Sequence, residues 1–327
     1  MTVGLTYDLR SAYLKEGFSD DDTAEFDRDD TIDSIETTLQ QLGYQTERIG
    51  HVRNLAKALT DGKRWDIVFN IAEGMYGIGR EAQVPALLDA YKIPYVFSDP
   101  LVLSLTLHKG MCKHVVRDCG IPTAPFAVVE KIADCNQIKF PFPLFAKPVA
   151  EGTGKGVDGK SKVNNKKELS QICAQLLEKY KQPVIVETYL PGREFTVGIV
   201  GTGKNAKSVG VLEVILRDDA EPDAYSYLNK EKCEELVQYV LVKDQVAKEC
   251  EKVALDSWNA LGCCDGGRVD LRYDASGIPN FIEVNPLAGL HPLHSDLPIL
   301  SSMNGITYSE LIKMIMNSAM KRIKKDE

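Results

Sequence analysis

The sequence predicts a mixed α/β protein with more than one domain. Its 327 residues exceed what a single hydrophobic core usually organises, so two or three domains are expected. The first hundred residues alternate short apolar strands with amphipathic helices, a pattern typical of a parallel sheet covered by helices. Near the C-terminus two strand-like segments flank a turn that contains Gly277 and Pro279, which indicates an antiparallel hairpin instead.

The N-terminal α/β unit is predicted to end near Asp99. Its acidic stretch, residues 19–30, is interpreted as a solvated loop. Asp30 is expected to cap a helix that carries apolar residues at helical spacing and ends at Gly43. Strands are expected at residues 3–7, 45–49, 66–70 and 95–97.

The remaining chain is predicted to form two further domains. Residues 101–119 have the pattern of one helix, closed by Gly120, with Lys109 near its middle. Thr307 and Glu310 have the spacing of a capping box that opens a terminal helix. The expected domain boundaries are 1–99, 100–190 and 191–327.

Composition limits the function classes. A formal net charge of −8 argues against nucleic acid or an anionic membrane as the main partner. No apolar run approaches the length of a membrane span, and the N-terminus lacks a signal-peptide layout, so we expect a cytoplasmic protein. The eight cysteines include no C-x-x-C pair, which favours reduced, mostly buried thiols.

The C-terminal hairpin carries the first candidate site. Arg268 and Asp270 are two positions apart on one predicted strand, so their side chains face the same side. The same spacing places Glu283 and Asn285 together on the neighbouring strand. Carboxylate and amide oxygens suit Mg²⁺ that shares phosphate oxygens with a substrate. The alternative is an ordinary hairpin with a solvated polar face.

A glycine-rich loop is the second candidate. Residues 142–148 form an apolar run that contains Lys147, and residues 151–157 are rich in glycine. Glycine lets backbone amides approach phosphate oxygens closely. A Walker loop would need glycine at Val149 and Ser or Thr at Gly156, so that motif is excluded. Residues 184–200 follow as a strand, a Pro-Gly turn and a second strand, and we expect them to form a hinge whose backbone could meet an adenine edge.

In this order, the elements resemble ATP-grasp carboxylate–amine ligases, and among them the D-alanine–D-alanine ligase group. The resemblance runs from about Trp65 to the end of the chain and includes Gly289 and residues 295–298. It implies an ATP-grasp fold, with an N-terminal parallel α/β domain and two α+β domains that clasp ATP. It also implies ATP, one or two Mg²⁺ ions for which Mn²⁺ can substitute, and small amino-acid substrates.

The resemblance assigns roles residue by residue. The nucleotide would be held by Lys109 and Lys147 at the phosphates, by Glu151, Thr153, Gly154, Lys155 and Gly156 in the loop, by Glu187, Tyr189 and Leu190 at adenine, and by Glu194 at the ribose. Asp270, Glu283 and Asn285 would hold Mg²⁺. Arg268 and the Gly289 N–H would stabilise the oxyanion, Ser295 would bind the carboxylate of the amine donor, and Tyr227 would help a lid over residues 217–228 to close.

One part of the family pattern is missing. The glycine-rich turn whose glutamate binds the first substrate's amino group is not recognisable, and residues 4–10 stand in its place. Glu16, Glu73 and Glu81 are candidate substitutes. The amino acids joined therefore stay open, as does a homodimer. The alternatives are a ligase for another carboxylate–amine pair and a non-catalytic nucleotide-binding regulator.

Overall fold

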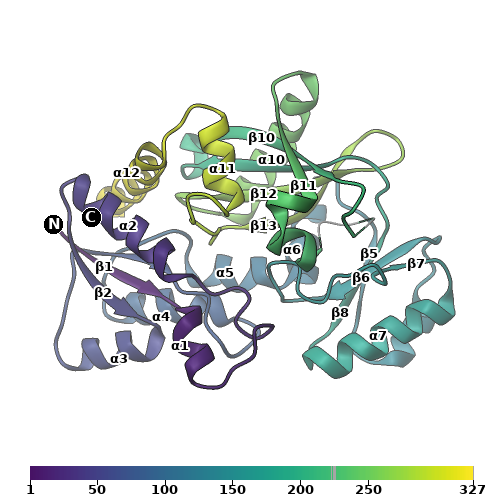
Figure 1. Ribbon diagram of the computed structural model, residues 1–327, viewed down its shortest axis with the longest axis horizontal. Coiled ribbons are helices and arrows are strands. Elements are labelled where there is room, and N and C mark those ends of the chain that lie inside the picture. The colour runs from purple at the N-terminus through teal and green to yellow at the C-terminus, as the bar shows by residue number, and fades with distance from the viewer. Residues whose placement is uncertain (222, 224–225, 327) are drawn as a thin grey trace.

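Three sheets organise the chain in the computed structural model, which describes residues 1–221, 223 and 226–326, with the side chains of 231 and 324–326 left out. Figure 1 shows the N-terminal sheet at the lower left, a second sheet at the right and the third above, with the yellow C-terminal helices in front of the third sheet and to its left. Strands β1–β4 fall within residues 1–99, β5–β8 within 100–190 and β9–β13 within 191–327. The three domain boundaries themselves stay a prediction.

The N-terminal sheet is parallel, with strand order β2-β1-β3-β4. All four predicted strands are present. The helix over the predicted apolar stripe is also present, but Asp30 is not its cap: the N-cap is Arg28, and Asp30 lies in the first turn. The elements are β1 (Thr2–Tyr7), α1 (Arg10–Lys15), α2 (Asp29–Gln41), β2 (Gln45–Gly50), α3 (Val52–Thr60), β3 (Ile67–Ile71), η1 (Arg80–Ala82), α4 (Gln83–Ala90) and β4 (Tyr95–Val96).

The predicted helix over 101–119 is wrong in one respect, because it is two helices. α5 (Pro100–Leu107) and α6 (Lys109–Asp118) are separated at His108, whose backbone ψ of 88° is not helical. The His108 ring accepts the Met111 N–H and so caps α6. Lys109 therefore opens a helix instead of lying in the middle of one, and its N–H donates to the carbonyl of Val149 at 2.9 Å.

The second sheet is antiparallel, with order β5-β8-β6-β7. Its apolar face packs on α7, which Asn165 caps through the Glu168 N–H. The elements are β5 (Phe126–Val129), η2 (Ile132–Gln137), β6 (Leu144–Pro148), β7 (Lys162–Val163), α7 (Lys166–Tyr180) and β8 (Val184–Thr188).

The third sheet is antiparallel, with order β11-β10-β9-β12-β13, and packs on α10 around Trp258. β8 and β9 belong to different sheets, so residues 189–193 connect two sheets. The elements are β9 (Glu194–Val200), η3 (Gly203–Asn205), β10 (Lys207–Leu216), α8 (Tyr227–Glu231), α9 (Cys233–Leu236), β11 (Val237–Val242), α10 (Gln245–Leu261), β12 (Gly266–Tyr273) and β13 (Pro279–Asn285).

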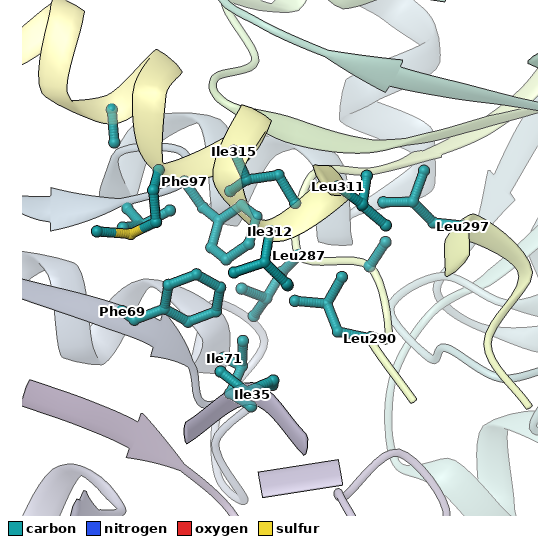
Figure 2. Close-up of a cluster of buried hydrophobic side chains, with 14 of the residues drawn as sticks. Ile35, Phe69, Ile71, Phe97, Leu287, Leu290, Leu297, Leu311, Ile312 and Ile315 are labelled. Atoms are coloured by element: carbon teal, nitrogen blue, oxygen red, sulfur yellow. The ribbon is translucent and has the colours of Figure 1, made fainter. Parts of the chain in front are cut away.

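The C-terminal helices return to the N-terminal domain. α11 (Asp296–Met303) and α12 (Tyr308–Asp326) follow β13, and Thr307 and Glu310 form the predicted capping box. Figure 2 shows Phe69 and Phe97 of the N-terminal domain packed with Leu287 and Ile312 in one buried cluster. Because this core is shared, the N-terminal domain is held against the loop that follows the β12–β13 hairpin.

Two further expectations concern the chain as a whole. All eight cysteines are free and six of them are buried, as predicted. No helix in the described part of the chain is long and apolar enough to cross a membrane.

Candidate active site

The carboxylates of the hairpin face each other as the sequence predicts. β12 and β13 pair antiparallel, with Asp270 opposite Glu283 and Arg268 opposite Asn285. Asp270 is 7% exposed and accepts the Thr196 hydroxyl at 2.9 Å. Its other oxygen contacts the Arg268 guanidinium and the Asn285 amide. The four predicted residues therefore form one polar surface.

Two lysines approach Glu283 from the far side of the cleft. Lys109 Nζ lies 3.5 Å and Lys147 Nζ 3.4 Å from the same carboxylate oxygen. Burial alone would raise the pKa of Glu283, but these lysines and Arg268 outweigh it and hold the pKa well below its usual value. The Glu283 carboxylate is therefore ionised and already surrounded by positive charge.

The hairpin suits Mg²⁺ carried by a nucleotide better than an independent metal centre. Within the described residues, no three His, Cys, Asp or Glu side chains gather as metal ligands. Asp270 and Glu283 would supply two carboxylates and Asn285 one amide oxygen, which leaves further ligands to come from water and phosphate oxygens. That division of ligands is the usual one for Mg²⁺ at nucleotide sites, and the residues fit it.

Glu187 is held from behind by a lysine that the sequence analysis missed. Lys113 is fully buried, and its ammonium contacts Glu187 at 2.6 Å, the Thr123 hydroxyl at 2.8 Å and the Phe281 carbonyl at 2.9 Å. Lys147 lies 3.7 Å from the other Glu187 oxygen. A charge four residues after Lys109 on α6 was the available signal, since i and i+4 share a helix face. Glu187 thus positions Lys147, and its contact with adenine stays a prediction.

The glycine loop has the backbone that the sequence predicts. Thr153, Gly154 and Gly156 have φ values of 52°, 75° and 74°, in the left-handed region that lets successive amides converge on an anion. A Cβ on Gly154 would lie 2.8 Å from the Tyr227 nitrogen. Helix α8 therefore lies directly on the loop, as expected of a lid, while the role of Tyr227 itself remains a prediction.

Glu151 and Lys155 form an ion pair inside the loop, at 2.7 Å. Behind this pair Arg80 binds Glu25 at 2.7 Å. Glu25 comes from the acidic stretch predicted to be a solvated loop, and that prediction is wrong here: its side chain is 7% exposed and accepts the Gly152 N–H at 2.7 Å. Neither Glu25 nor Arg80 was singled out, because no local pattern pairs residues 55 positions apart.

The side of the cleft predicted to bind the nucleotide is a cavity between the second and third sheets, and we call it the nucleotide cavity. Glu194 contacts Arg272 at 3.3 Å, and Arg272 also donates to the Tyr189 hydroxyl at 3.1 Å. Burial raises the pKa of Glu194, although Arg272 opposes this. Leu190 is buried. The cavity is lined by Lys109, Phe145, Lys147, Pro148, Glu151, Gly154, Lys155, Val157, Glu194, Lys230, Asp270, Arg272, Ile282 and Glu283.

Lys230 is a second residue that sequence reasoning missed. It lies on α8 and lines both the nucleotide cavity and the next one, which also contains Arg268, Gly289 and Ser295. A Cβ on Gly289 would lie 2.8 Å from the Ser295 hydroxyl oxygen, and that oxygen accepts the His291 N–H. We call this second space the acceptor cavity, because we expect it to bind the amino acid whose amine accepts the acyl group.

A third cavity lies between these two, and we call it the donor cavity. It shares Lys109 and Glu283 with the nucleotide cavity and Arg268 and Gly289 with the acceptor cavity. Of the three candidate substitutes for the missing glutamate, Glu73 and Glu81 line it together with Glu25. Glu16 is exposed at the end of α1, so it is a poor substitute.

Two antiparallel sheets that hold lysines and a carboxylate hairpin across one cavity define an ATP-grasp fold. A solved D-alanine–D-alanine ligase from Bacillus anthracis, in complex with ATP, shares that fold with a TM-score of 0.75, over 100% of both chains at 23% identity.

Sequence comparisons identify the family within this fold. The family described as D-ala D-ala ligase C-terminus matches residues 115–317. A D-alanine–D-alanine ligase of Bordetella petrii is 31% identical over 82% of this chain and 79% of that protein. An uncharacterized protein of Sinorhizobium fredii is 30% identical over 89% of this chain and 87% of that one. The chain belongs to the D-alanine–D-alanine ligase family.

Proposed function

We propose that the protein is an ATP-dependent ligase that joins two amino acids, with D-alanyl-D-alanine as the first product to test. One observation carries the proposal: two lysines on one side of a cleft reach a carboxylate hairpin on the other, at 3.4 and 3.5 Å from Glu283. Charge of both signs in one cleft suits a magnesium nucleotide. The two adjoining cavities leave room for two substrates.

The first step would be phosphorylation of the donor. A donor carboxylate oxygen attacks the γ-phosphorus of ATP, the bond to the β-phosphate oxygen breaks, and an acyl phosphate and ADP form. Lys109 and Lys147 would act as point charges on the phosphates, and the loop amides of Gly154 to Gly156 would cover them. Asp270, Glu283 and Asn285 would hold Mg²⁺, which neutralises phosphate charge when bound.

The second step would form the amide. The neutral amine of the acceptor attacks the acyl carbon, the tetrahedral oxyanion collapses, and phosphate leaves while the nitrogen loses a proton. Arg268 and the Gly289 N–H lie between the donor and acceptor cavities. They would stabilise the oxyanion, an effect worth about 3–4 kcal/mol for one donor. Ser295 would bind the acceptor carboxylate.

The lid has a clear task in this chemistry. An acyl phosphate hydrolyses if water arrives before the amine, so the cleft must be closed during both steps. The contact between α8 and Gly154 supports a closing role for residues 217–228, of which 222, 224 and 225 lie outside the described residues. A cytoplasmic location and a homodimer remain predictions.

The test is ADP release that depends on amino acids. Purified protein is incubated with Mg-ATP and pairs of D- or L-amino acids, and products are identified by mass. We expect stoichiometric ADP, phosphate and dipeptide. ATP binding without amino-acid-dependent turnover in any pair would favour the regulator instead.

A further inference from the structure

The donor cavity is strongly acidic on the side that the N-terminal domain provides. Glu25, Glu73 and Glu81 line it from this domain, and Glu151 lines it from the glycine loop. On the opposite side lie Lys109, Arg268 and Glu283. A donor carboxylate must face Lys109 to reach ATP, so the rest of the donor would point toward the acidic side.

Two of the four acidic residues are already neutralised. Glu25 binds Arg80 at 2.7 Å and the Gly152 N–H at 2.7 Å, so both of its oxygens have partners. Glu151 binds Lys155 at 2.7 Å. Arg80 also donates to the Ala150 carbonyl at 2.9 Å and lies 3.8 Å from Glu151.

The other two acidic residues of the donor cavity are Glu73 and Glu81. Neither carboxylate has a hydrogen bond or an ion pair with any other residue in the described part of the chain, yet Glu81 is only 9% exposed. Burial raises the pKa of Glu81 to about 7, although Arg80 opposes it. Burial and then the neighbouring Glu81 and Glu25 raise the pKa of Glu73 well above its usual value. Unpaired buried carboxylates are expensive unless a ligand supplies their partners.

The charges then indicate what the ligand carries. Four carboxylates face two cations, Arg80 and Lys155, and these cations pair with Glu25 and Glu151, so two of the four carboxylates have no ion-pair partner among the described residues. The α-ammonium of an ordinary amino acid neutralises one of them. Building on the ligation proposed above, we propose that the carboxylate donor is a diamino monocarboxylic acid, whose two ammonium groups pair with Glu73 and Glu81.

The competing arrangement is a monoamino donor such as alanine, with one proton shared between Glu73 and Glu81. The diamino and the monoamino arrangement predict different orders of substrate preference. A site built to bind a charged nitrogen rejects an analogue that lacks it, because its own polar group is then left unpaired. A diamino donor should therefore have a kcat/KM at least about 100-fold above that of alanine.

The experiment measures ADP release from the wild-type protein with alanine, 2,3-diaminopropionate, 2,4-diaminobutyrate, ornithine and lysine, each in both configurations and with alanine as acceptor. Tandem mass spectrometry of the dipeptide identifies the N-terminal residue, which is the donor. We expect a diamino residue there. If alanine is the preferred donor, this inference falls and the proposed function stands. If no amino acid stimulates ADP release, the proposed function falls and the inference with it.

Isosteric variants test whether Glu73 and Glu81 set the preference for a diamino donor. Glu81→Gln and Glu73→Gln should each reduce the ratio of diamino to monoamino kcat/KM by at least about tenfold and leave the KM for ATP unchanged. Glu16→Gln, at an exposed position outside the cavity, is the matched control and should keep the wild-type ratio. An unchanged ratio in both cavity variants would overturn the assignment.

Discussion

Lys113 offers a sharp test of how the cleft is held together. Its ammonium is fully buried and contacts Glu187 of β8 and the Phe281 carbonyl of β13, so it ties the second sheet to the third. Lys113→Met keeps an unbranched side chain that is one heavy atom shorter and removes the charge. Glu187 is then left with Lys147 at 3.7 Å as its remaining cation. Removing one partner of a buried pair costs about 3–5 kcal/mol.

Urea unfolding followed by tryptophan fluorescence measures this cost. Lys252→Met is the control, because its i,i+4 pair with Asp256 is 77% and 49% exposed and should be worth about 0.3–0.5 kcal/mol. The double variant Lys113→Met with Glu187→Gln should recover part of the loss, since no uncompensated charge then remains. If Lys113→Met costs no more than Lys252→Met, the buried pair does not have the structural role described here.

Three further predictions concern the site. Glu283→Gln should abolish turnover and also lower the unfolding midpoint, because Lys109 and Lys147 lose the carboxylate that pairs with them; near-wild-type activity would remove Glu283 from the site. Lys147→Ala should raise the KM for ATP, whereas Arg268→Ala should mainly lower kcat, because its oxyanion exists only during acyl transfer; steady-state kinetics at varied ATP separates the two. The raised pKa of Glu81, about 7, means that the folded state binds more protons than the unfolded state between pH 4.5 and 7. Stability should therefore fall as pH rises through this range, by about 3 kcal/mol from this group, and urea unfolding of Glu81→Gln should show a flatter profile.

Local patterns predicted the hairpin and the glycine loop because the residues that define each of them lie close together in the sequence. Asp270 and Glu283 lie opposite each other because two i, i+2 pairs meet across one turn, and Gly154 and Gly156 adopt the expected positive φ. Such features depend on neighbours within a few residues. They can be inferred before the tertiary structure is known.

Features that depend on distant segments were missed. Glu25 becomes buried only because Arg80 and Gly152 come to it from other parts of the chain, so its acidic surroundings in sequence suggested a solvated loop. Residues 101–119 have continuous helical periodicity. The break at His108 depends on a distant contact, in which the Lys109 N–H donates to the Val149 carbonyl, so the periodicity could not predict it.

The most direct test of the central claim follows oxygen from the donor carboxylate. The donor that gives the highest ADP release is labelled with ¹⁸O in its carboxylate and incubated with Mg-ATP and the acceptor. Attack of the carboxylate on the γ-phosphorus predicts that one labelled oxygen appears in inorganic phosphate for each amide formed. Dipeptide formation with unlabelled phosphate would contradict the acyl-phosphate route and, with it, the assignment of the cleft.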